Sequence, residues 1–416
     1  MERTTCLVVG GGPAGMVLGL LLARGGVEVT VLEKHGDFLR DFRGDTVHAS
    51  TLNLLDELGL GPAFEQVPHQ DVDKIEAMLD GGAKATIADL SRLPGPNKRI
   101  AMVPQWDLLD LLADAGRLEP TFTLRMNTAF TGLRKEGGKV TGVRYRTADG
   151  VEGEIAADLV VAADGRGSLV RAESRLPVHS FGTPMDVWWF RVPRKEDDPS
   201  GGLGRFGRGS GLVMLDRGDY FQIAFLIRKG TDRMLREAGV RAFRDRMIAL
   251  VPMLADRMDA VTSLDDVKLL DVKLDRLRRW HGDGVLCIGD AAHAMSPIGG
   301  VGINLAVQDA VAAATILAAP LRRGRVTPSA LAKVRRRRWL PTAVTQGAQR
   351  VIQNAFLRRT LDGKVDVGGA GTPLPLRVLQ RFPRLQGVPA YLVAIGLRPE
   401  HAPSFARREP AKIERS

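Results

Sequence analysis

The chain has 416 residues, and its 44% hydrophobic and 26% charged content is typical of a soluble globular protein with two or three domains. Its net charge of +11 would suit nucleic acid, but the arginines are scattered and only 5% of residues are aromatic, so we expect solvated basic faces and no nucleic-acid partner. The densest run of arginines, residues 335–338, is expected on the exposed side or end of a helix. We find no signal peptide and no apolar run of the roughly 18 residues that a membrane span needs, so we expect a cytoplasmic protein without a transmembrane segment.

The N-terminal region combines an apolar strand, a glycine turn and the start of a helix. The strand is predicted at residues 6–9, and the turn is Gly10-Gly11-Gly12-Pro13-Ala14-Gly15. Backbone N–H groups at the start of such a helix can approach a pyrophosphate, because the glycines carry no Cβ atom. Glu33 ends a second strand at residues 27–32, where it can accept hydrogen bonds from a ribose. This order predicts a dinucleotide site but does not distinguish NAD from FAD.

The region from about residue 179 to residue 275 is rich in predicted strands. They lie at residues 187–192, 212–215 and 220–227, and a helix follows near residues 240–250. We expect these strands to form a sheet that covers a substrate.

A second motif near the C-terminal end distinguishes the two cofactors. A strand at residues 285–288 leads into Gly289-Asp290-Ala291-Ala292-His293, and Pro297-Ile298-Gly299-Gly300-Val301-Gly302-Ile303-Asn304 follows. The acid after the strand suits the ribityl chain of a flavin, and the glycines allow a backbone to lie against an isoalloxazine ring. The sequence therefore predicts FAD. We expect His293 to be structural, because a flavin carries its own redox chemistry.

A third element, Asp158-Leu159-Val160-Val161-Ala162-Ala163-Asp164-Gly165-Arg166-Gly167-Ser168, lies between these two motifs. In this order the three resemble the motifs of the class A FAD-dependent monooxygenases. These are the p-hydroxybenzoate-hydroxylase-like aromatic hydroxylases, which are related to ubiquinone-biosynthesis and polyketide-tailoring hydroxylases. The resemblance spans residues 1 to about 320.

The resemblance implies an α/β fold with a Rossmann-like FAD-binding domain of the glutathione-reductase type. A β-sheet substrate domain would interrupt it, and a helical C-terminal segment would follow. The expected ranges are 1–68, 104–178 and 276–340 for the FAD-binding domain, 69–103 and 179–275 for the substrate domain, and 341–416 for the C-terminal segment.

The resemblance also implies which residues bind the cofactor. They are Gly10, Gly12, Ala14, Gly15, Glu33, Arg43, Gln105, Asp164, Asp290, Gly302, Ile303 and Asn304. The planar guanidinium of Arg43 suits phosphate or flavin oxygens. Other readings stay open: Arg43 as a surface arginine, Gln105 as a polar residue at a helix N-terminus, and the two aspartates as helix caps.

The implied reaction consumes NADPH or NADH and inserts one oxygen atom of O2 into an aromatic or polyketide-like small molecule through a flavin C4a-hydroperoxide. Because the flavin performs the chemistry, no catalytic side chain is certain, and Arg43 and Pro297 are the candidates. The substrate sheet should keep the flavin face dry. Lys34 and Arg40 lie near the first acid and favour NADPH, because they could meet a 2′-phosphate.

Substrate contacts are predicted for Trp189, Met214 and Gln222, although strand alternation places only half of the sheet residues on the substrate side. No arginine is positioned to grip a carboxylate, which favours a larger neutral aromatic substrate over a benzoate.

Three alternatives stay open. A flavin-dependent halogenase would have a Trp-x-Trp-x-Ile-Pro signature, which Trp188-Trp189-Phe190-Arg191-Val192-Pro193 breaks at Phe190 and Val192. A Baeyer–Villiger or epoxidising enzyme would use the same scaffold with a different substrate. A non-enzymatic flavin-binding protein would not consume nicotinamide.

The two cysteines lie in separate apolar strands, so both are expected to be buried. Without a Cys-x-x-Cys pair or a ligand cluster, we expect neither a flavin disulfide reductase nor a metal site. The chain is expected to be a monomer or homodimer. The apolar segment Ala390–Leu397 has three open readings, which are a dimer interface, a cap over the pocket and peripheral membrane contact.

Overall fold

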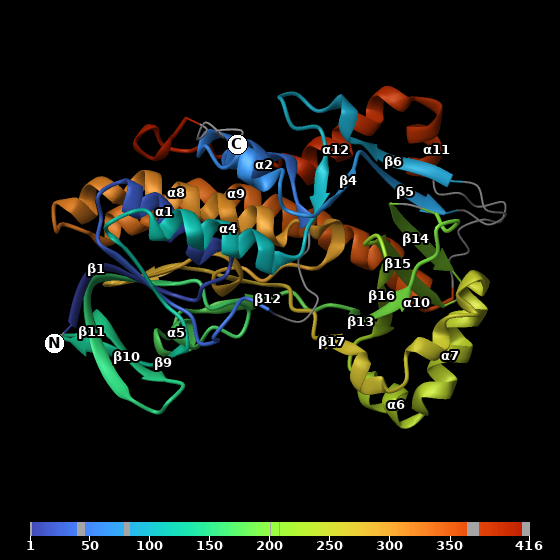
Figure 1. The fold of residues 1–416 in the computed structure, drawn as a ribbon, viewed down its shortest axis with the longest axis horizontal. Helices are drawn as coiled ribbons and strands as arrows, with labels where there is room; N and C mark the ends of the chain where they lie inside the picture. Colours follow the sequence, from blue (N-terminus) through green and yellow to red (C-terminus); the bar gives the residue numbers. More distant parts are fainter. Residues whose placement is uncertain are drawn as a thin grey trace, which may run out of the picture.

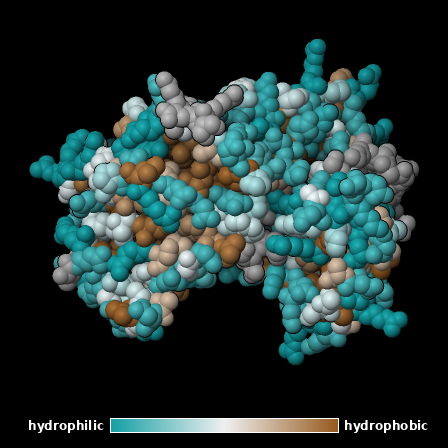
Figure 2. Space-filling model, in the orientation of Figure 1, coloured by the Kyte–Doolittle hydropathy of each residue, from teal (hydrophilic) through white to brown (hydrophobic). Residues whose placement is uncertain are grey.

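The computed structural model describes residues 2–39, 46–78, 84–199, 201–207, 209–363 and 374–409. Two sheets dominate it and lie in different parts of the molecule (Figure 1). Hydrophilic side chains cover most of the face seen in Figure 2, and apolar side chains gather there in small groups. The molecule is hollowed along its lower edge in that view, between the parts built on the two sheets.

The larger sheet has eight strands, and its central strands are parallel. Its members are β1 (Glu2–Val9), β2 (Val29–Leu32), β8 (Phe122–Arg125), β9 (Thr128–Glu136), β10 (Lys139–Thr147), β11 (Glu152–Ala162), β19 (His281–Gly282) and β20 (Val285–Cys287). β2 and β20 are buried along their whole length, as expected for parallel strands covered on both faces. Cys6 and Cys287 are both buried here, and burial raises the pKa of the Cys6 thiol to about 12.

Four helices lie together over one side of this sheet (Figure 1). They are α1 (Pro13–Arg24), α4 (Gln105–Arg117), α8 (Gly302–Arg322) and α9 (Pro328–Ile352). α8 with its preceding turn, residues 298–322, is long and apolar enough to cross a membrane, a run that the sequence analysis missed. Within this molecule 72% of its most apolar window is buried, since α8 packs between α1 and α9 as a core helix.

The second sheet has seven strands and takes its members from two separate stretches of the chain. They are β5 (Lys74–Met78), β6 (Lys84–Asp89), β13 (Met185–Pro193), β14 (Gly202–Gly207), β15 (Ser210–Asp216), β16 (Tyr220–Arg228) and β17 (Lys268–Leu270). Its outer face packs against α6 (Asp232–Glu237) and α7 (Gly239–Leu250). The expected Rossmann-like fold interrupted by a second β-sheet is thereby confirmed.

Two small sheets join these parts. β3 (Thr46–Val47), β7 (Ile100–Met102) and β4 (Gln70–Val72) form one, and β12 (Val178–Ser180) pairs with β18 (Asp275–Leu277) in the other. The range 69–103 therefore contributes both to the seven-stranded sheet and to a sheet that includes β3. Our domain boundaries stay a prediction.

The C-terminal part is helical, as predicted. α9 continues through residue 341, where we expected a new segment, into a π-helical turn η8 (Gln353–Leu357) and α10 (Arg358–Leu361). α11 (Leu374–Arg381) and α12 (Gly387–Ala394) follow.

The arginine run on α9 corrects one expectation. We expected residues 335–338 on an exposed side or end of a helix, but Arg338 is fully buried. Its Nε donates to Asp309 Oδ1 at 3.0 Å, and its Nη1 lies 3.5 Å from Glu400 Oε1. Asp309 Oδ2 is 2.5 Å from His293 Nε2 and accepts the Gly289 N–H at 3.1 Å. This network joins α8 and α9 to the loop after β20, so His293 is structural.

Asp309 carries the negative charge of this network. Burial opposes that charge, but His293 and Arg338 outweigh it and hold the pKa of Asp309 below its ordinary value of 3.8. Because the pKa is lower in the folded than in the unfolded state, the stabilisation is present above about pH 4. It is lost as the pH falls through the folded pKa.

We predict that Asp309→Asn lowers the free energy of unfolding by about 3–5 kcal/mol at pH 7, because it leaves the buried Arg338 guanidinium with a weaker partner. Urea denaturation followed by tryptophan fluorescence measures this. Asp114→Asn is the control, since Asp114 pairs with Arg117 on the surface with 73% of its side chain exposed, and a change below about 0.5 kcal/mol is expected. Equal stability of the two variants would contradict the role of Asp309.

Candidate active site

The glycines of the turn between β1 and α1 have two different surroundings. A Cβ on Gly10 would lie 2.5 Å from the carbonyl oxygen of Ala163, and a Cβ on Gly15 would lie 1.9 Å from that of Gly10. These two glycines are needed for the fold itself. A Cβ on Gly12 would meet no described atom within 4 Å. Open space therefore lies beside the N-terminus of α1, where backbone N–H groups favour an anion.

Glu33 ends β2 and faces this turn. Its Oε2 accepts the Gly11 N–H at 3.0 Å, its Oε1 accepts the His35 N–H at 3.0 Å, and its side chain is buried. The carboxylate is held in place by backbone donors at the position where the sequence predicts a ribose contact. Ala14, the other predicted residue here, is buried in the first turn of α1.

Asp164 follows β11 and carries an unsatisfied atom. Its Oδ2 accepts the Val170 N–H at 3.2 Å from α5 (Leu169–Glu173), but its Oδ1 is buried without a hydrogen-bond partner among the described residues. Burial raises the pKa of Asp164. The N-cap of α5 is Ser168 rather than Asp164. A buried acceptor without a donor fits a site completed by a bound group.

The structure brings all three sequence motifs together. Gly289 of the second motif lies against the first motif, because a Cβ on it would be 3.3 Å from that of Ala14 and 3.1 Å from that of Ala306 on α8. Asp290 is partly exposed, and its Oδ2 accepts from Arg166 Nη2 of the third motif at 3.3 Å. The residues present fit FAD. The open N-terminus of α1 suits the pyrophosphate and the fixed carboxylate of Glu33 suits the ribose. Asp164, with its unsatisfied oxygen, and the partly exposed Asp290 suit further hydroxyl groups of the cofactor.

The segment Pro297–Val301, called the flavin loop below, precedes α8. Gly299 and Gly300 have positive φ values of 78° and 64°, a conformation that favours glycine. A Cβ on Gly300 would lie 2.7 Å from Thr46 Oγ1, which donates to the Gly300 carbonyl oxygen at 3.1 Å. β3 therefore holds one end of the flavin loop.

The start of α8 presents backbone rather than side-chain groups. No side chain caps α8. Asn304 Oδ1 accepts hydrogen bonds from Ser50 Oγ at 2.5 Å and Thr51 Oγ1 at 3.1 Å, both on α2 (Ala49–Glu57). The Asn304 side chain is thus engaged within the protein, and the positive end of the helix is left at Gly302 and Ile303.

The remaining predicted cofactor and catalytic residues are less informative. Gln105 is the first residue of α4 and is partly buried, and Pro297 is partly buried at the start of the flavin loop. Arg40 and Arg43 lie outside the described residues. Sequence reasoning missed the roles of Thr46, Ser50 and Thr51. The only signal was that these three hydroxyl residues follow shortly after Arg43 in the sequence.

The two faces of the seven-stranded sheet separate the predicted substrate residues. Met214 is on the outer face, in the core that includes Phe243 of α7. Trp189 is on the inner face, where it clusters with Val213, Ile298 of the flavin loop and Phe356 of η8. Met214 therefore does not join Trp189 beside the flavin loop.

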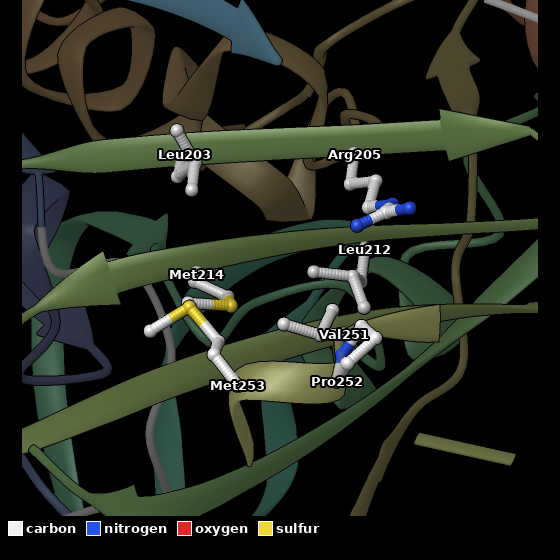
Figure 3. Close-up of a pocket in the computed structure, with 7 residues that line it drawn as sticks. All are labelled: Leu203, Arg205, Leu212, Met214, Val251, Pro252 and Met253. Atoms are coloured by element: carbon white, nitrogen blue, oxygen red, sulfur yellow. The ribbon is translucent and has the colours of Figure 1, made fainter. Parts of the chain in front are cut away.

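A cavity of about 180 Å³ lies on the outer face, between β14, β15 and the short turn at residues 252–254. Figure 3 shows Met214 and Met253 pointing into it beside Leu212, with Arg205 nearby. Since this cavity is on the opposite side of the sheet from Trp189 and Ile298, it is separate from the site at the flavin loop.

Two of the predicted substrate residues, Gln222 and Trp189, lie on the inner face and carry polar groups. Gln222 is 1% exposed, and its Oε1 accepts from Arg217 Nε at 2.9 Å, so its amide oxygen is engaged within the protein. The indole N–H of Trp189 is buried and has no hydrogen-bond partner among the described residues. An unsatisfied buried donor costs about 1–3 kcal/mol, so this N–H fits an acceptor atom on a bound substrate.

Comparison with known proteins identifies relatives. A family model described as an FAD binding domain matches residues 3–348. The 6-methylpretetramide 4-monooxygenase of Streptomyces rimosus is 36% identical over 394 residues, which cover 93% of this chain and 91% of the relative. A 12-dehydrotetracycline 5-monooxygenase/anhydrotetracycline 6-monooxygenase of the same species is 29% identical over 328 residues, which cover 74% of this chain and 61% of the relative.

Among solved structures, the OxyS anhydrotetracycline hydroxylase from Streptomyces rimosus aligns with a TM-score of 0.71 and 22% identity. The alignment covers 94% of this chain and 76% of the other. At this identity the likeness shows the shared fold.

We predict that Gly12→Ala leaves the stability of the FAD-free protein nearly unchanged but weakens FAD binding at least tenfold. Its φ of −77° suits alanine and the added methyl enters open space, which is where a pyrophosphate would approach. Flavin fluorescence titration gives the Kd. Gly347→Ala on α9, also with nothing within 4 Å, is the matched control and should bind FAD normally. Unchanged FAD affinity in Gly12→Ala would remove the pyrophosphate from this position.

Proposed function

Since this chain belongs to the FAD-binding-domain family of class A flavin monooxygenases, we propose that it inserts one oxygen atom of O2 into an aromatic or polyketide-like small molecule, using NADPH or NADH. Bound FAD would supply the redox chemistry, accepting hydride and activating oxygen. The observation that carries the proposal is the contact between the flavin loop and the inner face of the sheet, where Ile298 clusters with Trp189.

The protein would contribute binding, orientation and exclusion of water. The N-terminus of α8 at Gly302 and Ile303 supplies a positive dipole end that would stabilise negative charge developing on a reduced flavin. Apolar side chains on the sheet would keep that region dry. Asp164 and Asp290 would hold cofactor hydroxyls, and the role of Arg43 stays a prediction.

The inner face favours a neutral aromatic substrate. Its clustered residues are Val187, Trp189, Phe206, Val213, Ala224, Leu226, Ile298 and Phe356. This apolar surface suits an aromatic ring system, and a substrate without a carboxylate anchor stays part of the proposal. The relatives' names point the same way, since one is named for 6-methylpretetramide and another for anhydrotetracycline. Substrate contact by Trp189 and Gln222 is part of this proposal, whereas Met214 is withdrawn from it.

The nicotinamide coenzyme would bind transiently, because the glycine fingerprint occurs once in the sequence. Lys34 is exposed directly after Glu33, which supports NADPH over NADH. We keep a cytoplasmic location and a monomer or homodimer as expectations.

The halogenase alternative has less support. In the segment that partly matches its signature, Trp188 and Phe190 lie in the outer core with Phe243, and Trp188 Nε1 donates to Asp232 Oδ1 at 2.7 Å. Baeyer–Villiger or epoxidising chemistry stays open, because it would differ in the substrate rather than in this scaffold.

The function is tested by anaerobic absorbance spectroscopy of the FAD-loaded protein. NADPH, and more slowly NADH, should bleach the flavin, and an aromatic polyketide ligand should accelerate the bleaching. Admitting O2 should then give a product one oxygen atom heavier by mass spectrometry. Flavin that stays oxidised until a separate reductase supplies reduced FAD would favour the halogenase.

We predict opposite effects of Trp189→Phe on stability and on substrate use. Removing the unsatisfied N–H should stabilise the substrate-free protein slightly, whereas loss of a hydrogen bond to the substrate should lower kcat/KM about three- to tenfold, equivalent to about 0.5–1.5 kcal/mol. Thermal unfolding and steady-state kinetics measure the two effects.

Trp188→Phe is the matched control for this variant. It breaks the bond to Asp232 on the outer face, so it should lower Tm and leave KM unchanged. An unaltered kcat/KM in Trp189→Phe would show that the indole N–H does not contact substrate.

A further inference from the structure

The C-terminal helix α12 packs directly against the flavin loop. Val393 of α12 joins an apolar cluster with Val301, the last residue of the loop, and with Met295 and Leu305, which flank the loop on both sides. A Cβ built on Gly299 would lie 3.8 Å from Val393 Cγ2. Of the three readings of residues 390–397, burial of this segment within its own chain favours a cap at the pocket, since Ala390 and Ala394 are fully buried.

His48 links α12 to this loop. It lies between β3 and α2, is 1% exposed, and its Nδ1 is 2.8 Å from the Val393 carbonyl oxygen. Because a carbonyl only accepts, Nδ1 carries the proton. The opposite edge of the ring faces Gly300, where a Cβ would lie 3.4 Å from Nε2. Burial lowers the pKa of His48 to about 4, so the ring is neutral at pH 7.

The flavin loop needs such support because of its glycines. Gly299 and Gly300 lower the cost of the positive φ values but raise the entropy that the loop loses when it is ordered. On the α9 side, Gln349 fixes the start of the loop, with Nε2 donating to the carbonyl oxygens of Ser296 at 2.9 Å and Ile298 at 3.0 Å. On the other side, Thr46 donates to the Gly300 carbonyl oxygen and the His48 ring packs against Gly300, with Nε2 buried and without a hydrogen-bond partner among the described residues.

We propose that His48 is a positioning residue that transmits the packing of the C-terminal helix α12 to the flavin loop, so that α12 is part of the flavin site. The proposal rests on the proposed function in one respect, which is that the group facing the loop is a flavin. A second bond supports the same coupling: Gln308 Nε2 of α8 donates to the Ile395 carbonyl oxygen at 3.2 Å and to Ser50 Oγ at 3.2 Å. α12 is thus joined both to the loop and to the helix that follows it.

The test compares two replacements of the ring. His48→Asn keeps an N–H near the position of Nδ1, whereas His48→Phe keeps a planar ring but leaves the Val393 carbonyl oxygen without its donor. In the FAD-free protein, His48→Phe should accelerate hydrogen exchange of the amides at residues 298–303 about tenfold. It should also raise the Kd for FAD about tenfold, and His48→Asn should restore most of both.

In the loaded enzyme, His48→Phe should divert a larger share of the consumed NAD(P)H to hydrogen peroxide, with less change in the KM for substrate. Leu392→Ala is the control, since Leu392 is on α12 but 46% exposed, lies in a surface groove with Arg92 and Val388, and does not belong to the Val393 cluster. It should behave as the unaltered protein in every measurement.

Two results would overturn the proposal. One is wild-type exchange and FAD affinity in His48→Phe, and the other is an equal loss in Leu392→Ala. Should His48→Phe fail to fold, Thr46→Val removes only the bond to Gly300 and should give the same pattern more weakly. Hydrogen exchange and FAD affinity are measured without substrate. They would therefore still test the role of His48 if the protein proved to have no monooxygenase activity.

Discussion

Close approach of backbone segments at three glycines is the constraint on which the site depends. Gly10 lies against the chain after β11, Gly15 lies against Gly10, and Gly289 lies between α1 and α8. A side chain at any of these positions would push apart elements that carry the cofactor residues. The same small residues that allow a nucleotide to approach therefore also hold the three motifs together, and the fold and the site cannot be separated.

The seven-stranded sheet serves two purposes with its two faces. The outer face packs on α7 through large side chains such as Trp188 and Phe221, which fixes the strands. The inner face then offers Trp189 and Val213 to the flavin loop from a rigid support. Because packing of the outer face on α7 fixes the strands, the side chains of the inner face have little freedom to move, and this face can exclude water and orient a substrate.

Buried polar networks position the loops that are not held by the hydrogen bonds of the sheets. Asp309 and Arg338 hold the loop after β20, and Ser50 and Thr51 hold Asn304 at the start of α8. These bonds join residues far apart in the chain. They give fixed backbone positions, and their hydrogen bonds and ion pairs offset part of the desolvation cost, although Arg338 Nη2 and His293 Nδ1 are buried without a partner among the described residues.

The sequence alone determined the FAD-binding family and the class of fold, since each motif is local: strand, glycine turn and acid follow one another within a few residues. It also indicated that alternate side chains of each strand in the second sheet point to opposite faces. Alternation does not tell which face is which, so only packing against α7 placed Met214 on the outer face and Trp189 on the inner face. Likewise, four consecutive arginines could not reveal that Arg338 is buried against Asp309. The contact between His48 and Val393 spans 345 positions, and no local pattern marks it, because the partner is a backbone carbonyl that any residue could supply.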